Sequence, residues 1–256
     1  MQDVNFDPLV DRFKANIFDS LKGRIRRAVI LDRLQNIDPF PGVLEPTVAD
    51  IGGGFGDMSL HFASHGATVD YFDLSENMAA MMRDRLGDYP QYLDKVTVRN
   101  GRFQDMIDAL YDLVHCQAVL EWLADPWQGL KILCDSVRPG GYLLLTFYNR
   151  DSIIFKNLIK GNFRKAFSEE MAGDARGLTP IHPLDKGQVF DFLGTENMVI
   201  EKWFGVRSFS DYLYPHVNKQ NPKIEKAILD AELKVCEREP YRSLARYIGV
   251  IARRQS

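Results

Sequence analysis

Cysteine is scarce in this sequence of 256 residues, and long apolar segments are missing from it. The three cysteines, Cys116, Cys134 and Cys236, are too few and too widely spaced for a disulfide framework or a zinc site, so we expect a reducing, cytoplasmic environment. No run of about 18 apolar residues occurs, and the first residues lack the basic and apolar pattern of a signal peptide. The sequence therefore predicts neither a membrane span nor secretion.

Neither sign of charge is in large excess, because 32 Lys and Arg stand against 35 Asp and Glu, a formal net charge of −3. This balance excludes a uniformly basic nucleic-acid coat and leaves room for a local basic face. Metal-ligand spacing is also lacking: His61 and His65 are four residues apart with no third ligand following, so we predict no metal site. The length and the 45% apolar content fit one α/β domain with additions.

The glycine-rich stretch from Val48 to Gly56 is the most informative part of the chain. It predicts a buried strand that ends on Asp50 and turns through glycines into a helix, so that backbone faces whatever lies above the turn. A dinucleotide fingerprint, G-x-G-x-x-G, would place its third glycine at Asp57, where a carboxylate would oppose a diphosphate. The pattern present is D-x-G-x-G-x-G, with an acid two residues before Gly52.

An acid at this place suits a cofactor with a cationic end, because it can pair with an ammonium group or orient the loop amides. The pattern resembles motif I of the class I S-adenosylmethionine (SAM) methyltransferases. The predicted cofactor-binding residues of the loop are Asp50, Gly52, Gly53 and Gly54. A glycine turn without a ligand and a nucleotide-binding dehydrogenase are the weaker alternatives.

From residue 47 onward, strand and helix patterns alternate. We expect strands at 47–51, 68–72, 95–99, 111–117, 142–148, 199–206 and 245–252. The predicted fold class is α/β, a seven-stranded, mostly parallel sheet of the class I methyltransferase (Rossmann-like) type, with a final antiparallel hairpin and helical insertions. We expect a helical cap over residues 1–46 and a methyltransferase domain over 47–256, with substrate-side insertions at about 149–185 and 207–244.

Further cofactor contacts are expected where strands end. Asp73 closes the second strand 21 residues after Gly52, where a carboxylate can accept both ribose hydroxyls, although it can also cap the next helix. A guanidinium group suits the cofactor carboxylate, and Arg24, Arg26 and Arg27 are the candidates, with full solvation as the alternative.

The loops after the third and fourth strands are expected to complete the cofactor site. After the third strand, Phe103 offers a ring to adenine, and Gln104 or Asp105 can accept from its exocyclic amine. An ordinary polar turn is the alternative for these three. Gln117, at the end of the fourth strand, lies where a methyl group would be transferred.

The segment 149–165 is locally basic and contains two phenylalanines. Its cations are Arg150, Lys156, Lys160, Arg164 and Lys165. Basic residues mixed with aromatic ones suggest a face for phosphates and bases, whereas the alternative is a solvated amphipathic helix.

The whole chain resembles one family, the bacterial tRNA 5-carboxymethoxyuridine methyltransferases. The residues that carry this resemblance are Met1-Gln2-Asp3, Asn5-Phe6-Asp7, Asn16-Ile17-Phe18, Lys22-Gly23, Arg26, Asp50, Gly52-Gly53-Gly54, Asp73-Leu74-Ser75, Ala118-Val119-Leu120-Glu121-Trp122, Phe147-Tyr148-Asn149, Gly161-Asn162-Phe163, Gly205-Val206-Arg207, Asp211-Tyr212-Leu213, Glu239-Pro240-Tyr241 and Arg246-Tyr247-Ile248. The glycine motif is shared by a very large superfamily, whereas the N-terminal segment and the two insertions are specific.

The resemblance implies SAM-dependent methylation of the carboxymethoxy group on the wobble uridine, with the tRNA anticodon loop as partner. By position it implies SAM contacts for Arg26, Gly52, Gly53 and Asp73. Members of the family often carry histidine where this chain has Gln117, which implies that no base is obligatory there.

A substrate carboxylate is already ionised at neutral pH, so catalysis needs alignment rather than a base. We therefore expect substrate positioning by Gln117, Tyr148, Arg207 and Arg246, and RNA contacts by the basic segment with Arg207, Arg242 and Arg246. The alternatives are a small-molecule O-methyltransferase and a non-catalytic SAM-binding protein.

Overall fold

A computed structural model describes residues 2–7, 20–35, 37, 40, 42–168 and 180–255, and the structural statements below concern those residues. The helical pattern expected over 8–36 is described from residue 20 on, as helix α2 (Leu21–Gln35). Its first half lies outside the described residues. None of the described helices is long and apolar enough to cross a membrane.

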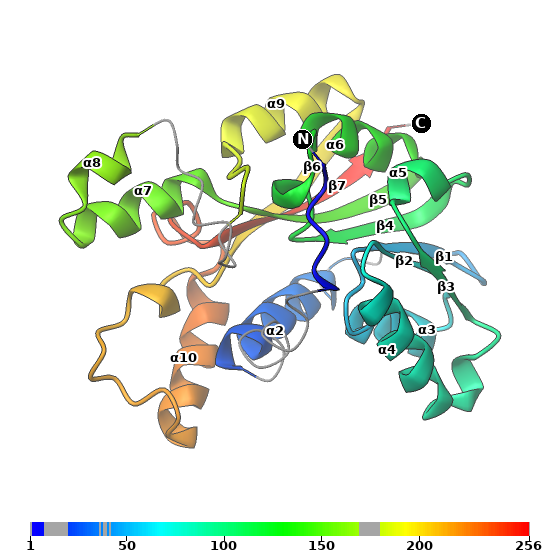
Figure 1. Cartoon of the computed structure of the whole chain (residues 1–256), viewed down its shortest axis with the longest axis horizontal. Coiled ribbons are helices and arrows are strands. Elements are labelled where there is room, and N and C mark those ends of the chain that lie inside the picture. The colour runs from blue at the N-terminus through cyan, green and yellow to red at the C-terminus, as the bar shows by residue number, and fades with distance from the viewer. Residues whose placement is uncertain are drawn as a thin grey trace.

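Seven strands form one sheet in the order β3-β2-β1-β4-β5-β7-β6 (Figure 1). Their bounds are β1 (Thr47–Ile51), β2 (Thr68–Asp73), β3 (Val96–Asn100), β4 (Tyr111–Gln117), β5 (Val137–Tyr148), β6 (Met198–Val206) and β7 (Tyr247–Arg254). Strands β1 to β5 pair in parallel, and β7 pairs antiparallel with both β5 and β6. The predicted fold class is confirmed.

Helices cover both faces of this sheet. They are α2, α3 (Asp57–Ser64), α4 (Glu76–Gly87) and α10 (Pro222–Val235) on one face, and α5 (Phe103–Met106), α6 (Pro126–Asp135) and α9 (Lys186–Thr195) on the other. Two more, α7 (Arg150–Ile159) and α8 (Phe163–Ala166), lie beyond the carboxyl end of β5 (Figure 1). Short 3-10 turns are η3 (Pro90–Tyr92), η4 (Leu120–Trp122) and η5 (Ser210–Tyr212).

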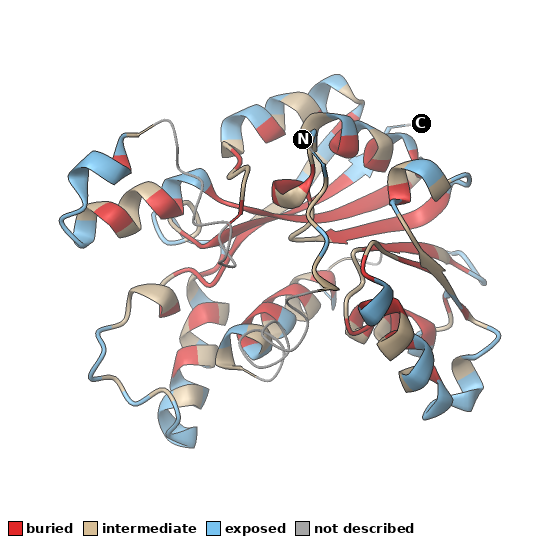
Figure 2. Ribbon diagram, viewed as in Figure 1, coloured by how far each residue is buried: buried red, intermediate tan, exposed pale blue. Residues whose placement is uncertain are grey.

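The central strands are apolar on both sides because helices cover both faces, and Figure 2 shows them as the most buried part of the molecule. Four buried polar residues on β1, β4 and β5 break this rule, namely Asp50, Asp112, His115 and Thr146. Asp50 on β1 and His115 on β4 are both buried, and they are paired in register across the neighbouring strands. Strands β1 and β4 flank the point where the strand order reverses, and a crevice for ligands is expected beyond their carboxyl ends.

A buried glutamate on α10 holds the connection that follows β6. The Glu232 carboxylate accepts hydrogen bonds from the backbone N–H groups of Ser208, Phe209 and Ser210, at 2.7, 3.2 and 3.0 Å. Three donors that would otherwise be unpaired are thereby satisfied. The chain that carries Arg207 and Asp211 is thus fixed from beneath by a helix of the second insertion.

Candidate active site

Glycines shape the turn between β1 and α3. Gly52, Gly54 and Gly56 have φ values of 64°, 53° and 75°, which side chains rarely adopt. A Cβ on Gly52 would lie 2.3 Å from Val119, and one on Gly53 would lie 2.4 Å from the Tyr71 ring. By contrast, the nearest atom to a Cβ on Gly54 would be 4.0 Å away. The backbone therefore presents a smooth face with open space above Gly54.

Asp73 ties this turn to the end of β2. Its carboxylate accepts hydrogen bonds from the N–H groups of Gly54 and Ser75, both at 2.9 Å. Burial raises the pKa of Asp73 to about 6, while these N–H groups act in the opposite direction. The group is therefore ionised at neutral pH and can accept hydrogen bonds from a diol. Ser75 caps the N-terminus of α4, since its side chain accepts a hydrogen bond from Met78 N–H.

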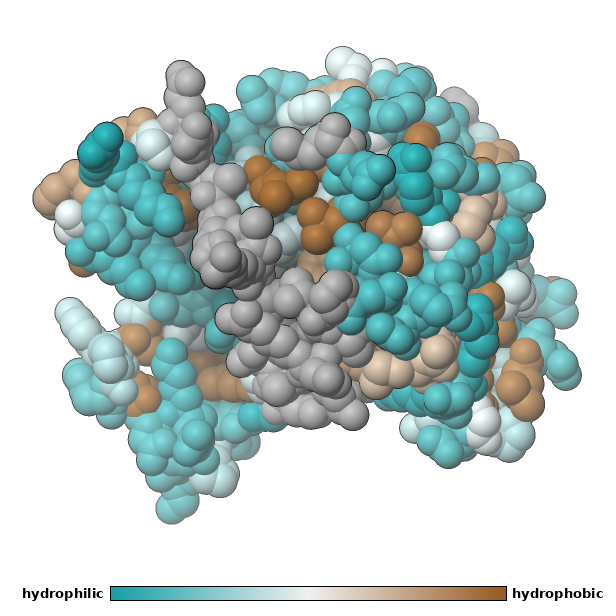
Figure 3. Space-filling view, viewed as in Figure 1, coloured by the Kyte–Doolittle hydropathy of each residue, from teal (hydrophilic) through white to brown (hydrophobic). Residues whose placement is uncertain are grey.

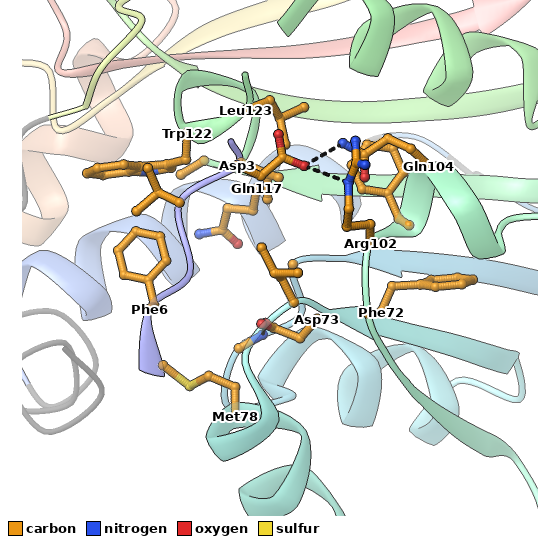
Figure 4. A pocket seen from close by; sticks show the side chains of 18 of the residues that line it. Asp3, Phe6, Phe72, Asp73, Met78, Arg102, Gln104, Gln117, Trp122 and Leu123 are labelled. Atoms are coloured by element: carbon orange, nitrogen blue, oxygen red, sulfur yellow. Dashed lines mark hydrogen bonds and ion pairs between the residues drawn. The ribbon is translucent and has the colours of Figure 1, made fainter. Parts of the chain in front are cut away.

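A hollow that is open to solvent, with about 1010 Å³ of empty space including that opening, extends from Asp73 to the ends of β3 and β4 (Figure 4). Phe103 and Gln104 line it, as expected for residues beside adenine, whereas Asp105 does not and pairs with Arg102 at 3.6 Å. Gln117 lines this hollow and also a second one beside the glycine turn. The site thus joins the ends of four neighbouring strands.

The N-terminal strap, defined here as residues 2–7, closes one wall of the hollow (Figures 1 and 4). The Asp3 carboxylate accepts from Arg102 Nε at 3.1 Å, Gln104 Nε2 at 3.0 Å and Ala124 N–H at 2.8 Å. Phe6 packs edge-on against Trp122, with ring centroids 4.9 Å apart. The strap therefore bridges the loops after β3 and β4 across the hollow. Sequence reasoning missed it, because the segment has no periodic pattern.

The described contacts of Asp50 differ from the expectation that it orients the loop amides. Its carboxylate lies 2.7 Å from His115 Nδ1 and accepts from the Ser59 hydroxyl. The amides of Gly52 and Gly53 donate to the carbonyl of Phe72 instead. Asp50 lines the second hollow from below and holds β1, β4 and α3 together there. His115 was missed because a lone histidine in an apolar strand gives no distinctive signal.

The three candidate arginines of α2 have different surroundings. Arg24 pairs with Glu225, and Arg27 is exposed. Arg26 is buried, lines both hollows and has its guanidinium 4.9 Å from the centre of the Tyr247 ring. Among the described residues no carboxylate pairs with it. Arg26 is therefore the guanidinium best placed for an incoming carboxylate.

A second buried cluster lies near Tyr247. Asp211 accepts from Arg207 at 2.5 Å and from Arg246 Nε at 2.6 Å, and Arg246 also donates to the Tyr148 hydroxyl at 2.7 Å. Although burial acts in the opposite direction, the two guanidinium groups hold the pKa of Asp211 well below its ordinary value. The Arg207 guanidinium lies 5.9 Å from the centre of the Tyr247 ring. Arg26 and this cluster thus both adjoin the Tyr247 ring.

The remaining predicted RNA-binding residues fall into two groups. Lys156, Lys160, Arg164 and Lys165 lie on α7, on α8 and between them, and the last three are exposed. Arg150 is exposed at the start of α7. Arg242 is elsewhere: it pairs with Glu239 and lies 3.6 Å from the centre of the Trp203 ring. Its described contacts do not bring it into the cluster of Arg207 and Arg246.

Glu121 is fully buried, and no side chain among the described residues forms a hydrogen bond with its carboxylate. Burial raises its pKa to about 7. The described residues contain no group of three or more His, Cys, Asp or Glu side chains that could hold a metal ion.

These residues fit a nucleoside with an amino-acid end. Asp73 offers acceptors to a diol, Phe103 a ring to a base, Arg26 a guanidinium to a carboxylate, and Gly54 open space above its backbone. The sheet order and this site define a SAM-dependent methyltransferase of class I, with SAM as the cofactor.

Comparison with known proteins narrows this class. Residues 49–145 match the family described as "Methyltransferase domain". The tRNA 5-carboxymethoxyuridine methyltransferase of Escherichia coli K12 is 34% identical over 257 aligned residues, which cover 99% of this chain and 97% of that protein. The chain belongs to the tRNA 5-carboxymethoxyuridine methyltransferase family.

Other similarities are at lower sequence identity. A ubiquinone biosynthesis O-methyltransferase from Shewanella is 29% identical over 62% of this chain and 70% of its own length. Magnesium protoporphyrin IX methyltransferase from Synechocystis, solved with bound SAH (S-adenosylhomocysteine), aligns with a TM-score of 0.64 over 98% of this chain and 96% of that one, at 15% identity. That likeness shows the fold.

Loosening the strap should accelerate cofactor exchange. In Asp3→Ala the three hydrogen bonds that hold the strap across the hollow are lost, so we expect SAH to dissociate about 10-fold faster or more. Stopped-flow displacement of labelled SAH measures this rate. Asp135→Ala, which removes an exposed carboxylate paired with Lys131, is the control. Equal dissociation rates in the two variants would show that the strap does not limit exchange.

Glu121 should make stability depend on pH. Between pH 4.5 and about 7 the folded protein keeps a proton that the unfolded chain has released, so the free energy of unfolding falls as pH rises. We expect Glu121→Gln to remove this fall and to gain up to about 3 kcal/mol above pH 7, with no gain near pH 4. Urea unfolding across this range measures it, with Glu201→Gln as the exposed control. Parallel curves for wild type and Glu121→Gln would contradict the assignment.

Proposed function

We propose that the protein transfers a methyl group from SAM to the carboxylate of 5-carboxymethoxyuridine at the wobble position of tRNA, giving the methyl ester. One observation carries the proposal: a buried cationic cluster lies a single aromatic ring away from the cofactor hollow. The name of the 34% identical relative supports both the tRNA and the modified base.

Positive charges outnumber negative ones in the cluster of Arg207, Arg246 and Asp211, which favours the binding of an anion. Arg207 and Arg246 share the single carboxylate of Asp211, and Arg207 Nε is buried without a partner among the described residues. Desolvation lowers the pKa of Lys156 to about 8, and the charges of Arg246 and Arg207 contribute. Desolvation and the same two arginines also lower the pKa of Lys22. Four cations therefore surround one carboxylate, an arrangement that a substrate carboxylate or phosphate would stabilise.

The proposed reaction requires the protein only to position the substrate carboxylate and to bind its charge. When bound, SAM supplies an electrophilic methyl group, and a carboxylate is already ionised at neutral pH, so no general base is required. The Tyr148 hydroxyl accepts from Arg246 and keeps its own hydrogen free to donate. A neutral donor of this kind can orient the attacking oxygen without the strong charge pairing that would hold it back, while a guanidinium group binds the second oxygen.

The basic surface of α7 and α8 supports RNA over a free small molecule. Lys160, Arg164 and Lys165 are exposed on it, together with Phe163, which is 62% exposed. Lys156 connects this surface to the cluster of Arg207 and Arg246. Phosphate groups flanking a base in the cluster would meet these cations.

The direct test uses purified protein, SAM and two pools of tRNA, one containing 5-carboxymethoxyuridine and one lacking it. We expect nucleoside mass spectrometry to show a methyl ester in the first pool alone. Methylation of both pools, or of neither, would refute the proposed substrate. Binding of tRNA should also weaken steeply with salt, which a small-molecule methyltransferase would not show.

Arg207 should act on the substrate and not on the cofactor. In Arg207→Ala we expect kcat/KM on modified tRNA to fall about 100-fold, because a charge-assisted contact to the carboxylate is lost, while the Kd for SAM stays within about 3-fold. Arg253→Ala, at the opposite end of the sheet, is the control. Calorimetry and initial rates measure the two quantities, and thermal unfolding checks that the variant is folded. Unchanged turnover in Arg207→Ala would refute its assignment.

A further inference from the structure

An aromatic pair stands exposed on the loop between η5 and α10. Tyr214 is 73% exposed, and its ring stacks on that of His216 with centroids 5.6 Å apart and planes 10° from parallel. The loop is held by a hydrogen bond from Val217 N–H to the Tyr214 carbonyl and by one from Lys219 Nζ to the Ser210 carbonyl. The pair is thus an ordered flat surface that no described part of the chain covers.

This surface is close to the anion cluster. Tyr214 follows Asp211, which binds both Arg207 and Arg246, by three residues, so at most about 11 Å of chain separates them. The neighbouring cations on the same loop and the next helix are Lys219 and Lys223. A nucleotide adjacent to one held in the cluster would therefore reach the Tyr214 ring.

The loop faces the basic surface of α7 and α8 across an opening. In Figure 3 the two parts of the molecule are separated by a hollow at the left edge, and Figure 1 places α7 and α8 on one side of it and the η5–α10 loop on the other. Phe163 and Phe167 on the α8 side are 62% and 73% exposed. Both sides of the opening thus carry exposed rings among cations.

Rings among lysines and arginines suit single-stranded nucleic acid, because every base has a face that stacks and every phosphate has a charge to neutralise. Protein interfaces are depleted in lysine, which argues against a protein partner here. We propose that the Tyr214–His216 pair is a stacking platform for a base next to the wobble nucleotide in the anticodon loop. This inference rests on the proposed function and adds a recognition residue to it.

The test uses an anticodon stem-loop with 5-carboxymethoxyuridine at the wobble position and the fluorescent base 2-aminopurine beside it. With wild type we expect stacking on Tyr214 to quench the fluorescence. In Tyr214→Ala the quenching should disappear and the affinity fall about 10-fold, and Tyr214→Phe should restore both. Tyr89→Ala is the matched control, since Tyr89 is also exposed and stacks on Tyr92, away from the cluster.

The outcomes separate the platform from the proposed function. If wild type and Tyr89→Ala bind and methylate the stem-loop and Tyr214→Ala does so with equal affinity and equal quenching, the platform is refuted while the function stands. Such a result would instead favour a protein partner for the exposed Tyr214–His216 pair. If wild type neither binds nor methylates the stem-loop, the proposed function fails and the platform fails with it.

Discussion

The bond between the Asp73 carboxylate and the Gly54 amide fixes the cofactor site, because it joins the end of β2 to the glycine turn after β1. The turn can come this close only with glycines, since side chains at Gly52 and Gly53 would collide with Val119 and Tyr71. Asp50 holds the same turn from beneath through Ser59 and His115. The two carboxylates thus differ in their contacts. Asp73 can accept further hydrogen bonds from a ligand, whereas the described contacts of Asp50 are all with protein side chains.

A second constraint is the unequal charge around Asp211. Keeping two buried guanidinium groups on one carboxylate costs desolvation energy that the pair alone does not fully recover. The cluster is nevertheless held in place by hydrogen bonds, because Glu232 accepts from the backbone of Ser208 to Ser210 and the Tyr148 hydroxyl accepts from Arg246. An arrangement that is costly without a ligand and held rigidly is best explained by binding, here of an anion beside the cofactor hollow.

The seven strands, their mostly parallel pairing and the glycine turn could be predicted from the sequence, because alternating strand and helix patterns and the D-x-G-x-G-x-G spacing are local signals. The cluster could be predicted only in part: the family resemblance pointed to Arg207 and Arg246, but their shared partner Asp211 and the charge of Lys22 depend on tertiary packing. Arg242 shows the converse, since its sequence neighbours gave no sign that it would lie on Trp203. The strap and His115 lacked any periodic signal, and although the family resemblance included Asp3 and Asn5-Phe6-Asp7, it did not place them at the cofactor hollow.

Tyr247 adjoins both the cofactor hollow and the cluster of Arg207 and Arg246. It starts β7, the strand that runs antiparallel between β5 and β6, and therefore brings Arg246 to the same end of the sheet as Tyr148. The guanidinium groups of Arg26 and Arg207 lie 4.9 and 5.9 Å from the centre of its ring. Cations near an aromatic ring are stabilised by it without being neutralised. Both guanidinium groups can then keep their charge, as the proposed binding of a cofactor carboxylate by Arg26 and of a substrate carboxylate by Arg207 requires.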